Sequence, residues 1–292
     1  MFFKILLTER NSIYIIVPSI KRHNVYLDST TMRQIFKILV LVGTICVLAL
    51  QVQAEERGSE MVLIPEGEFT MGNSDESGRN DERPAHQVYL DAYFMDRFEA
   101  TGKDFEDYMD DQPKVHPTIT GWYDRKVRPD MTQRPVFGLT WKRCRNYCVW
   151  AGKRLPTEAE WERSAKGQDD RVYPWGNELP DPSRANFGRC CFVMKGLIFT
   201  DVGTLKAGKT PNNIYDLAGN VAEWVSDWYD KNYYKVSPRK NPQGPEKGKY
   251  HTIRGGAWNS FSGYLRSSAR YGYNDANDFY GIGCRCARSA KK

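Results

Sequence analysis

Two segments in the first third of the chain alternate apolar and polar residues at the spacing of a half-buried β-strand. Residues 61–71 (MVLIPEGEFTM) carry β-branched and aromatic side chains and run into Gly72 and Asn73, and residues 86–94 (HQVYLDAYF) alternate in the same way. A period of two that ends at turn-forming residues is typical of strands. We therefore predict extended structure in both segments, with a polar loop over the charged residues 74–83 between them.

Helical patterns follow in three later segments. Residues 99–109 and 140–150 place apolar side chains on one helix face. Thr157 begins a third helix, because its hydroxyl can cap the first turn and Glu160, three residues on, completes a capping box. Beyond Gly167 the chain is rich in proline, glycine and polar residues, which predicts long loops, and long loops in a compact domain usually carry function.

The N-terminal pattern is typical of a secretory signal. Arg33 and Lys37 precede an uninterrupted apolar run over residues 38–50, and small residues follow over residues 52–54. A transmembrane anchor is the alternative, but the run is shorter than the roughly 20 apolar residues that span a bilayer. Cleavage is therefore the favoured interpretation.

These patterns predict three parts: an upstream extension over residues 1–31, a signal peptide over residues 32–54, and a single domain over residues 55–292 that is secreted or periplasmic. The first 54 residues hold six basic and two acidic residues, so the net charge falls from +6 to +2 once they are removed. Because the remaining chain has no Lys/Arg stripe and no nucleic-acid-binding motif, we expect no nucleic-acid partner. After cleavage we expect no membrane span.

Six cysteines follow the predicted signal, an even number that favours disulfides in an exported protein. Residues i and i+4 of a helix lie about 6 Å apart along its axis, and residues i and i+2 of a strand about 6.6 Å. Cys144 and Cys148 on a helix can therefore bridge Cys284 and Cys286 on a final strand as two parallel disulfides. A metal site is the alternative for these four. The adjacent residues 190–191 are both cysteine and have no evident partner.

Four motifs carry a family resemblance. Residues 216–224 read DLAGNVAEW, residues 154–162 read RLPTEAEWE, residues 254–258 read RGGAW, and residues 283–288 read GCRCAR where the family usually has GFRCAR. Together they resemble the formylglycine-generating enzyme family, also called the sulfatase-modifying-factor family.

The resemblance covers residues 61–288 and implies the fold class. It implies a single α+β domain of the formylglycine-generating-enzyme type, related to the C-type lectin fold, with little regular secondary structure and held by a disulfide. Family members pair cysteines at the positions of Cys148 and Cys286. A bridge between Cys144 and Cys284 rests on spacing alone.

A calcium site is expected in the first motif. Asp216, Asn220 and Glu223 place three oxygen-bearing side chains close together, which suits a hard cation, although an acidic turn capped by hydrogen bonds is an equally simple alternative. The resemblance implies ligands at Asp216, Gly219, Val221 and Glu223, the middle two through backbone carbonyls. We expect one structural calcium ion.

A second calcium site of some relatives has a poorer match. It uses the position of Asn186 and the carbonyl of Phe187 together with a downstream aspartate. No aspartate occurs over residues 194–196, although Asp201 follows nearby.

The copper site of the family's oxidases is expected to be absent. Copper(I) prefers thiolate ligands, and the two cysteines of the oxidases correspond to Ser260 and Leu265. Ala257 and Ala222 also stand where the oxidases have a serine and a pocket-lining tryptophan. Neither a hydroxyl nor an isobutyl group replaces a thiolate ligand.

The same region is expected to present a ligand-binding face. Rigid aromatic area combined with small polar groups is typical of adaptable binding surfaces. Ordinary loop packing, with two arginines in structural ion pairs, is the alternative. The candidate residues are Trp258, Ser260, Tyr264, Arg266, Arg270, Tyr271 and Tyr273.

We therefore predict a calcium-stabilised binding or accessory module that recognises a protein or glycan ligand outside the cytoplasm. One alternative is an enzyme of the same family that oxidises or otherwise modifies a protein cysteine, as in sulfatase maturation. Another is a structural component of an envelope assembly. No catalytic triad, P-loop, dinucleotide fingerprint or zinc-protease motif occurs in the sequence.

Overall fold

The structure is a computed structural model that describes residues 4–8, 12–16, 59–73, 75, 78–116, 122–123, 125–189, 198–274 and 280–290. The chain forms two compact units, residues 1–53 and residues 54–292. In the first unit, β1 (Lys4–Thr8) and β2 (Ser12–Ile16) pair as an antiparallel hairpin. The predicted signal peptide over residues 32–54 lies outside the described residues. Within the described part of the chain, no helix has the length and apolar character needed to cross a membrane.

The second unit begins with four short strands where two longer ones were predicted. β3 (Met61–Ile64) and β4 (Gly67–Met71) are separated at Pro65, which has no N–H for a ladder hydrogen bond. β5 (His86–Leu90) and β6 (Tyr93–Asp96) are likewise separate. Each break lets the chain change partners, so that β4 pairs with β5 while β3 pairs with β6.

The three predicted helices are present, and their caps set their boundaries. α2 (Gly102–Asp111) starts later than predicted, because Thr101 and Asp104 form a capping box. α3 (Trp141–Trp150) is capped by the Thr140 hydroxyl. α4 (Glu158–Lys166) has the predicted capping box, in which the Glu160 N–H donates to Thr157 Oγ1 and the Thr157 N–H donates to Glu160 Oε2.

The central sheet has the strand order β11-β10-β9-β12. β12 runs parallel to β9, whereas β10 is antiparallel to both β9 and β11. A second sheet has the order β13-β6-β3, and β7 pairs with β8. The bounds of these strands are β7 Trp122–Tyr123, β8 Lys126–Val127, β9 Ala222–Trp228, β10 His251–Arg254, β11 Arg270–Tyr273, β12 Ile282–Gly283 and β13 Ala287–Ser289.

Short 3-10 helices punctuate the loops. They are η1 (Asn80–Glu82), η2 (Pro129–Met131), η3 (Lys206–Gly208), η4 (Tyr233–Lys235) and η5 (Ser262–Leu265). The large remainder of irregular chain agrees with the predicted α+β domain of low regular secondary structure.

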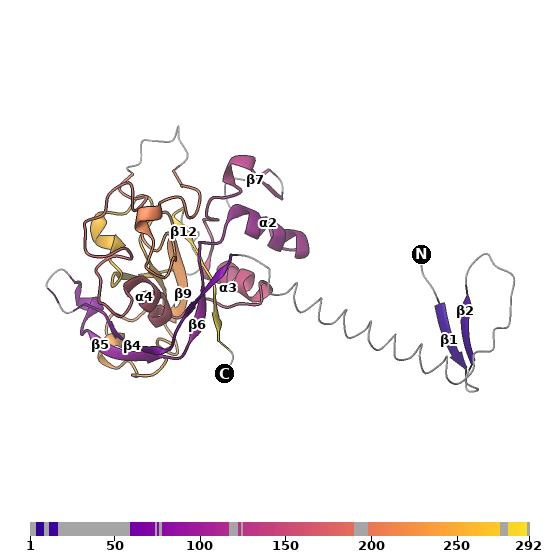
Figure 1. Ribbon diagram of the computed structural model, residues 1–292, viewed down its shortest axis with the longest axis horizontal. Helices are drawn as coiled ribbons and strands as arrows, with labels where there is room; N and C mark the ends of the chain where they lie inside the picture. The colour runs from indigo at the N-terminus through magenta and orange to yellow at the C-terminus, as the bar shows by residue number, and fades with distance from the viewer. Residues whose placement is uncertain are drawn as a thin grey trace. The chain divides into compact units, whose positions relative to one another are not determined.

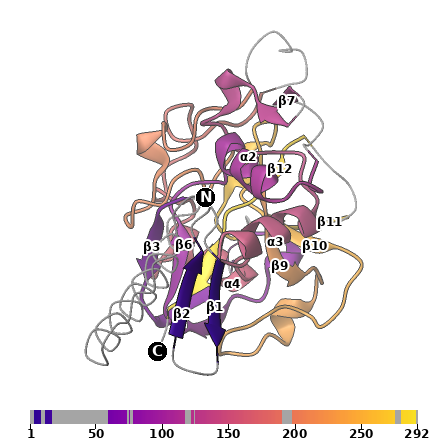
Figure 2. The same ribbon diagram turned by 90° about the vertical axis from the view of Figure 1, so that its right-hand side faces the viewer.

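The core of the second unit lies on both sides of β9. α3 and α4 both contact β9, and Figures 1 and 2 show the three elements at the centre of the unit. Trp161 of α4 is fully buried in one apolar cluster, and Trp224 of β9 is fully buried in another that also contains the four cysteines of α3 and the C-terminal segment. β9 therefore carries residues 222–228, which include the end of the DLAGNVAEW motif, through the middle of the core.

Candidate functional site

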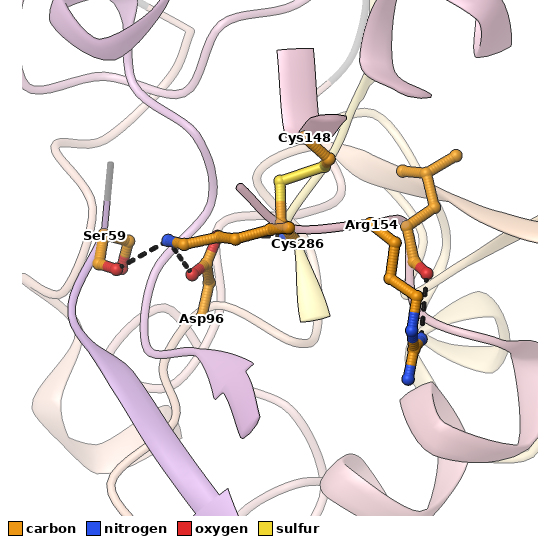
Figure 3. Close-up of a disulfide and its surroundings, with 7 residues drawn as sticks. Ser59, Asp96, Cys148, Arg154 and Cys286 are labelled. Carbon is orange, nitrogen blue, oxygen red and sulfur yellow. Dashed lines mark hydrogen bonds and ion pairs between the residues drawn. A yellow bond between two sulfur atoms is a disulfide. The ribbon is translucent and has the colours of Figure 1, made fainter. Parts of the chain in front are cut away.

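A disulfide joins α3 to the segment between β12 and β13. Cys148 and Cys286 are bonded with their Cα atoms 5.6 Å apart, and Figure 3 shows Asp96 beside them. The Cys286 N–H donates to Asp96 Oδ2 at 2.9 Å, and Lys153 Nζ donates to Asp96 Oδ1 at 2.6 Å. The pairing implied by the family resemblance is confirmed. Because the two cysteines are 138 positions apart, the chain-entropy model gives a stabilisation of about 4 to 5 kcal/mol.

Cys144 and Cys284 are free thiols, which corrects the second predicted disulfide. Both side chains are fully buried. Burial, and then the hydrogen bond and proximity of Cys284, raise the pKa of the Cys144 thiol. The spacing argument identified residues that do meet, but it could not decide their oxidation state. Cys190 and Cys191 lie outside the described residues.

Three carboxylates of the calcium motif and its surroundings share one arginine, and we name this set the Glu223 cluster: Glu99, Asp216, Glu223 and Arg285. Arg285 binds both oxygens of Glu223 at 2.8 Å, and Trp161 Nε1 donates to Glu223 Oε2 at 2.7 Å. Glu99 Oε1 accepts from the Val221 N–H at 3.1 Å. All four charged side chains are buried, so the hydrogen bonds replace water around them.

The electrostatics of the Glu223 cluster favour protonation of two of its members. Burial raises the pKa of Asp216 to about 6, with Glu223 adding to the rise and the Gly203 N–H and Arg285 opposing it. Burial, followed by the charges of Asp216 and Glu223, raises the pKa of Glu99 well above its ordinary value. The cluster thus has more negative charge than Arg285 balances.

The backbone around the cluster is tightly fixed. Gly219 has φ +83°, and a Cβ at this position would lie 2.4 Å from the Asn186 carbonyl oxygen, so only glycine fits. Asn220 Oδ1 accepts from Asn186 Nδ2 at 3.0 Å, while Asn186 Oδ1 is buried without a hydrogen-bond partner in the described structure. Phe187 packs at the edge of a separate apolar cluster.

The predicted calcium ligands fit a cation in part. Asp216 uses one oxygen to accept from the Gly203 N–H at 2.7 Å and keeps acceptor capacity on its carboxylate. Glu223 accepts hydrogen bonds from two nitrogens of Arg285 and from Trp161, so most of its acceptor capacity is already used inside the protein. Among the described residues, no three His, Cys, Asp or Glu side chains form a set that could hold a metal ion. A calcium ion would therefore depend mainly on Asp216, backbone carbonyls and Glu99.

Ser260 precedes η5, Leu265 ends it, and both lie beside Gly256. A Cβ on Gly256 would lie 3.1 Å from Leu265 Cδ2 and 3.3 Å from Ser260 Cβ. Ser260 Oγ accepts from the Ala257 N–H at 2.9 Å, and the Leu265 side chain is fully buried. Both side chains therefore lie beside Gly256, but they present a hydroxyl and an isobutyl group.

The aromatic members of the predicted ligand face remain partly accessible. Tyr264 is 41% exposed and stacks on Tyr271 with ring centroids 4.7 Å apart. Trp258 and Tyr273 are partly buried and pack against Phe199 and Trp224, respectively. The tyrosine pair is thus the accessible aromatic part of the face.

The two arginines predicted to belong to the ligand face instead form ion pairs inside the protein, which corrects the prediction for both. Arg266 is buried and binds both oxygens of Glu82 at 2.6 and 2.7 Å. Arg270 is fully buried and binds both oxygens of Glu158 at 2.7 Å. Neither guanidinium is free to meet a ligand, because each already has a carboxylate partner inside the protein.

Comparison with known proteins decides the family. A family model described as the sulfatase-modifying factor enzyme 1-like domain matches residues 48–290. This chain belongs to the sulfatase-modifying-factor family.

Relatives of this family member differ in length and in name. It is 32% identical over 279 residues to the formylglycine-generating enzyme of Mus musculus, covering 78% of this chain and 75% of that protein. It is 37% identical over 251 residues to a protein named serine/threonine-protein kinase pkn1 from Chlamydia pneumoniae, covering 79% of this chain. The chain spans only 38% of the length of that kinase-named relative. The solved structure of PvdO from Pseudomonas aeruginosa matches with a TM-score of 0.68 and 25% identity, covering 81% of this chain and 97% of PvdO.

The copper ion of the family's oxidases does not fit this member of the sulfatase-modifying-factor family. The positions that the resemblance assigns to copper carry Ser260 and Leu265, neither of which is a soft ligand for copper(I). Burial of Leu265 also closes that side of the site to solvent.

Sequence reasoning missed the residues that hold the site in place. Glu99, Glu82 and Glu158 each carry a buried carboxylate, and Glu158 and Glu82 pair with the two arginines described above. The sequence showed only that glutamates are frequent at helix starts and in loops. That pattern does not identify which arginine pairs with which glutamate. Arg285, inside the GCRCAR motif, could have been recognised as a counter-charge for Glu223.

Proposed function

We propose that this family member is an exported, non-oxidase binding or accessory module that recognises a ligand outside the cytoplasm. The observation that carries the proposal is the replacement of the copper ligands by Ser260 and Leu265. The disulfide between Cys148 and Cys286 supports export, since such bonds persist in oxidising compartments.

The thiols of the described structure support the absence of oxidase chemistry. Cys144 and Cys284 are fully buried, and burial raises the pKa of the Cys144 thiol, so that its thiolate is disfavoured. Neither can reach a substrate thiol at the surface. A copper-bound thiolate pair at Ser260 and Leu265 is excluded by their chemistry.

Calcium is the proposed structural cofactor. Asp216 and the carbonyls of Gly219 and Val221 would hold the ion, with Glu99 supplying a second carboxylate. Calcium prefers carboxylate and carbonyl oxygens, and it would supply positive charge where burial has raised the pKa values of Asp216 and Glu99.

The competing function is a formylglycine-generating oxidase. To test it, a peptide containing Cys-x-Pro-x-Arg is incubated with the full chain, copper and oxygen, and conversion of cysteine to formylglycine is followed by mass spectrometry. We expect no conversion. Conversion by the wild-type chain would overturn the proposal.

A matched variant checks that the assay can detect a restored site. Ser260→Cys with Leu265→Cys introduces two thiols at positions that both lie beside Gly256. We expect this double variant to bind copper(I) and the wild type not to bind it. The single Ser260→Cys variant, which supplies one thiolate, is the control.

A further inference from the structure

An open cleft of about 1020 Å³ lies beside η1 and η4, apart from Ser260 and Leu265. Its volume is close to the upper end of the range of ligand pockets, about 1,000 Å³. Its lining includes Arg79, Arg83, Lys231, Lys235, Asp81 and Tyr229. The lining therefore carries four basic side chains and one acidic one.

The basic groups of this cleft are only partly neutralised. Asp81 is buried and is already engaged by Arg79 at 3.0 Å and by the Tyr229 hydroxyl at 2.6 Å. No carboxylate of the described residues lies within ion-pair distance of Arg83, Lys231 or Lys235. Lys231 and Lys235 are exposed. The cleft thus holds positive charge that an anionic ligand would balance.

Buried ion pairs hold one wall of the cleft. Arg266 binds Glu82, and Arg270 donates to the Asp81 carbonyl at 3.1 Å, so both arginines support η1 from inside the protein. The Arg270 guanidinium also lies over the Tyr229 ring at 5.0 Å. A wall that is fixed before binding loses little conformational entropy when a ligand arrives.

An aromatic surface adjoins the charged cleft. The guanidinium of Arg79 lies 4.4 Å from the ring centroid of Tyr271, which stacks on the half-exposed Tyr264. Asn80 and Asn232 also line the cleft with exposed amide groups. Positive charge, amide groups and a flat aromatic surface therefore meet in one place.

We propose that this cleft binds an acidic oligosaccharide. Its sulfate or carboxylate groups would lie against Arg83, Lys231 and Lys235, its hydroxyls would bond to Asn80 and Asn232, and a sugar ring would lie over Tyr264. Charge-assisted hydrogen bonds supply the strongest contacts. The ring platform and the amides favour a sugar over an acidic peptide. This inference rests on the proposed function as a binding module and names its ligand class.

Binding to the full chain is measured by isothermal titration calorimetry with three hexasaccharides (a heparin-derived sulfated one, hexagalacturonate and neutral cellohexaose) and with hexa-aspartate as the acidic peptide. We expect binding of at least one acidic sugar and none of cellohexaose. Which acidic sugar binds more tightly distinguishes sulfate from carboxylate recognition. Binding should weaken as NaCl is raised from about 50 mM to about 500 mM, because salt screens exposed charges.

Matched variants place the binding in the cleft. Lys231→Gln with Lys235→Gln should weaken binding by about tenfold or more, since hydrogen bonds to charged groups are lost. Lys142→Gln with Lys247→Gln removes the same charge from exposed positions outside the cleft lining and should leave affinity within about twofold. Tyr264→Ala should weaken binding more than Tyr264→Phe, which keeps the ring.

Three results would overturn the inference: no binding of either acidic sugar, equal loss in both lysine double variants, or equal binding of hexa-aspartate. The last would indicate an acidic-peptide site. Failure here is separable from failure of the proposed function, because the peptide-conversion assay reports the oxidase chemistry independently.

Discussion

Two buried charge clusters involve α4, one through Glu158 and Glu162 and the other through Trp161, and they differ in the balance of positive and negative charge. In the first, the Glu158 cluster, Arg254 and Arg270 pair with Glu158 and Glu162 at distances of 2.7 to 2.8 Å. In the second, the Glu223 cluster, Arg285 serves three carboxylates. The charged side chains are buried in both clusters. Positive and negative groups are equal in number in the Glu158 cluster, whereas negative groups are in excess in the Glu223 cluster.

The pKa values follow that difference. Burial raises the pKa of Glu158, but Arg270 and Arg254 outweigh it and the net shift is downward. In the Glu223 cluster burial prevails, and the pKa values of Glu99 and Asp216 are raised. The comparison teaches that a buried carboxylate stays ionised only where its counter-charge is local. It is also the reason for proposing that calcium supplies positive charge to the Glu223 cluster.

Breaking the balanced cluster should have the largest effect. Glu158→Gln keeps the shape of the side chain but leaves Arg254 and Arg270 short of one negative charge. We expect the free energy of unfolding to fall by about 3 to 5 kcal/mol, measured by urea denaturation. Glu60→Gln removes a carboxylate from an exposed pair with Arg97 and should cost less than about 1 kcal/mol. Equal losses would show that local balance does not matter.

Supplying charge to the unbalanced cluster should have the next largest effect. Calcium at about a hundred times its dissociation constant should stabilise the wild type by about 2.7 kcal/mol. Asp216→Ala should abolish this response, and Asp107→Ala, which alters an exposed aspartate of α2, should preserve it. Thermal unfolding with EGTA and with calcium measures both. An unchanged calcium response in Asp216→Ala would remove the proposed site.

A smaller effect concerns Asp227, next to the balanced cluster. Burial, and then the charge of Glu158, raise its pKa from 3.8 to about 7. Because the folded-state pKa is raised, the stabilising contribution of its protonated form is present below pH 3.8 and is lost as the pH rises through 7. Relative to Asp227→Asn, the wild type should lose roughly 2 kcal/mol between about pH 5 and pH 8. Urea unfolding at both pH values tests this, and parallel pH profiles would contradict it.

Local chemistry was predictable from the sequence. The Thr157 and Glu160 capping box lies within one helical turn, so its geometry follows from four neighbouring residues. The disulfide of Cys148 and Cys286 was predictable through the family motifs. The motif residues also gave the fold, because they carry the family resemblance.

Long-range charge pairing was not predictable. Arg266 and Glu82 are 184 positions apart, and Arg270 and Glu158 are 112 apart. An arginine side chain can bind either a ligand or an internal carboxylate. Without knowledge of its burial, an arginine in a tyrosine-rich loop was therefore interpreted as part of a binding face. The free state of Cys144 and Cys284 was likewise beyond a spacing argument.

The placement of the last strands has a consequence for biosynthesis. β12 completes the central sheet beside β9, and β13 completes the second sheet beside β6. Neither sheet can therefore be completed before residues 282–289 have left the ribosome. Until then one edge of β6 and one edge of β9 lack their strand partners, so the domain completes its fold only after nearly all of it has been translated.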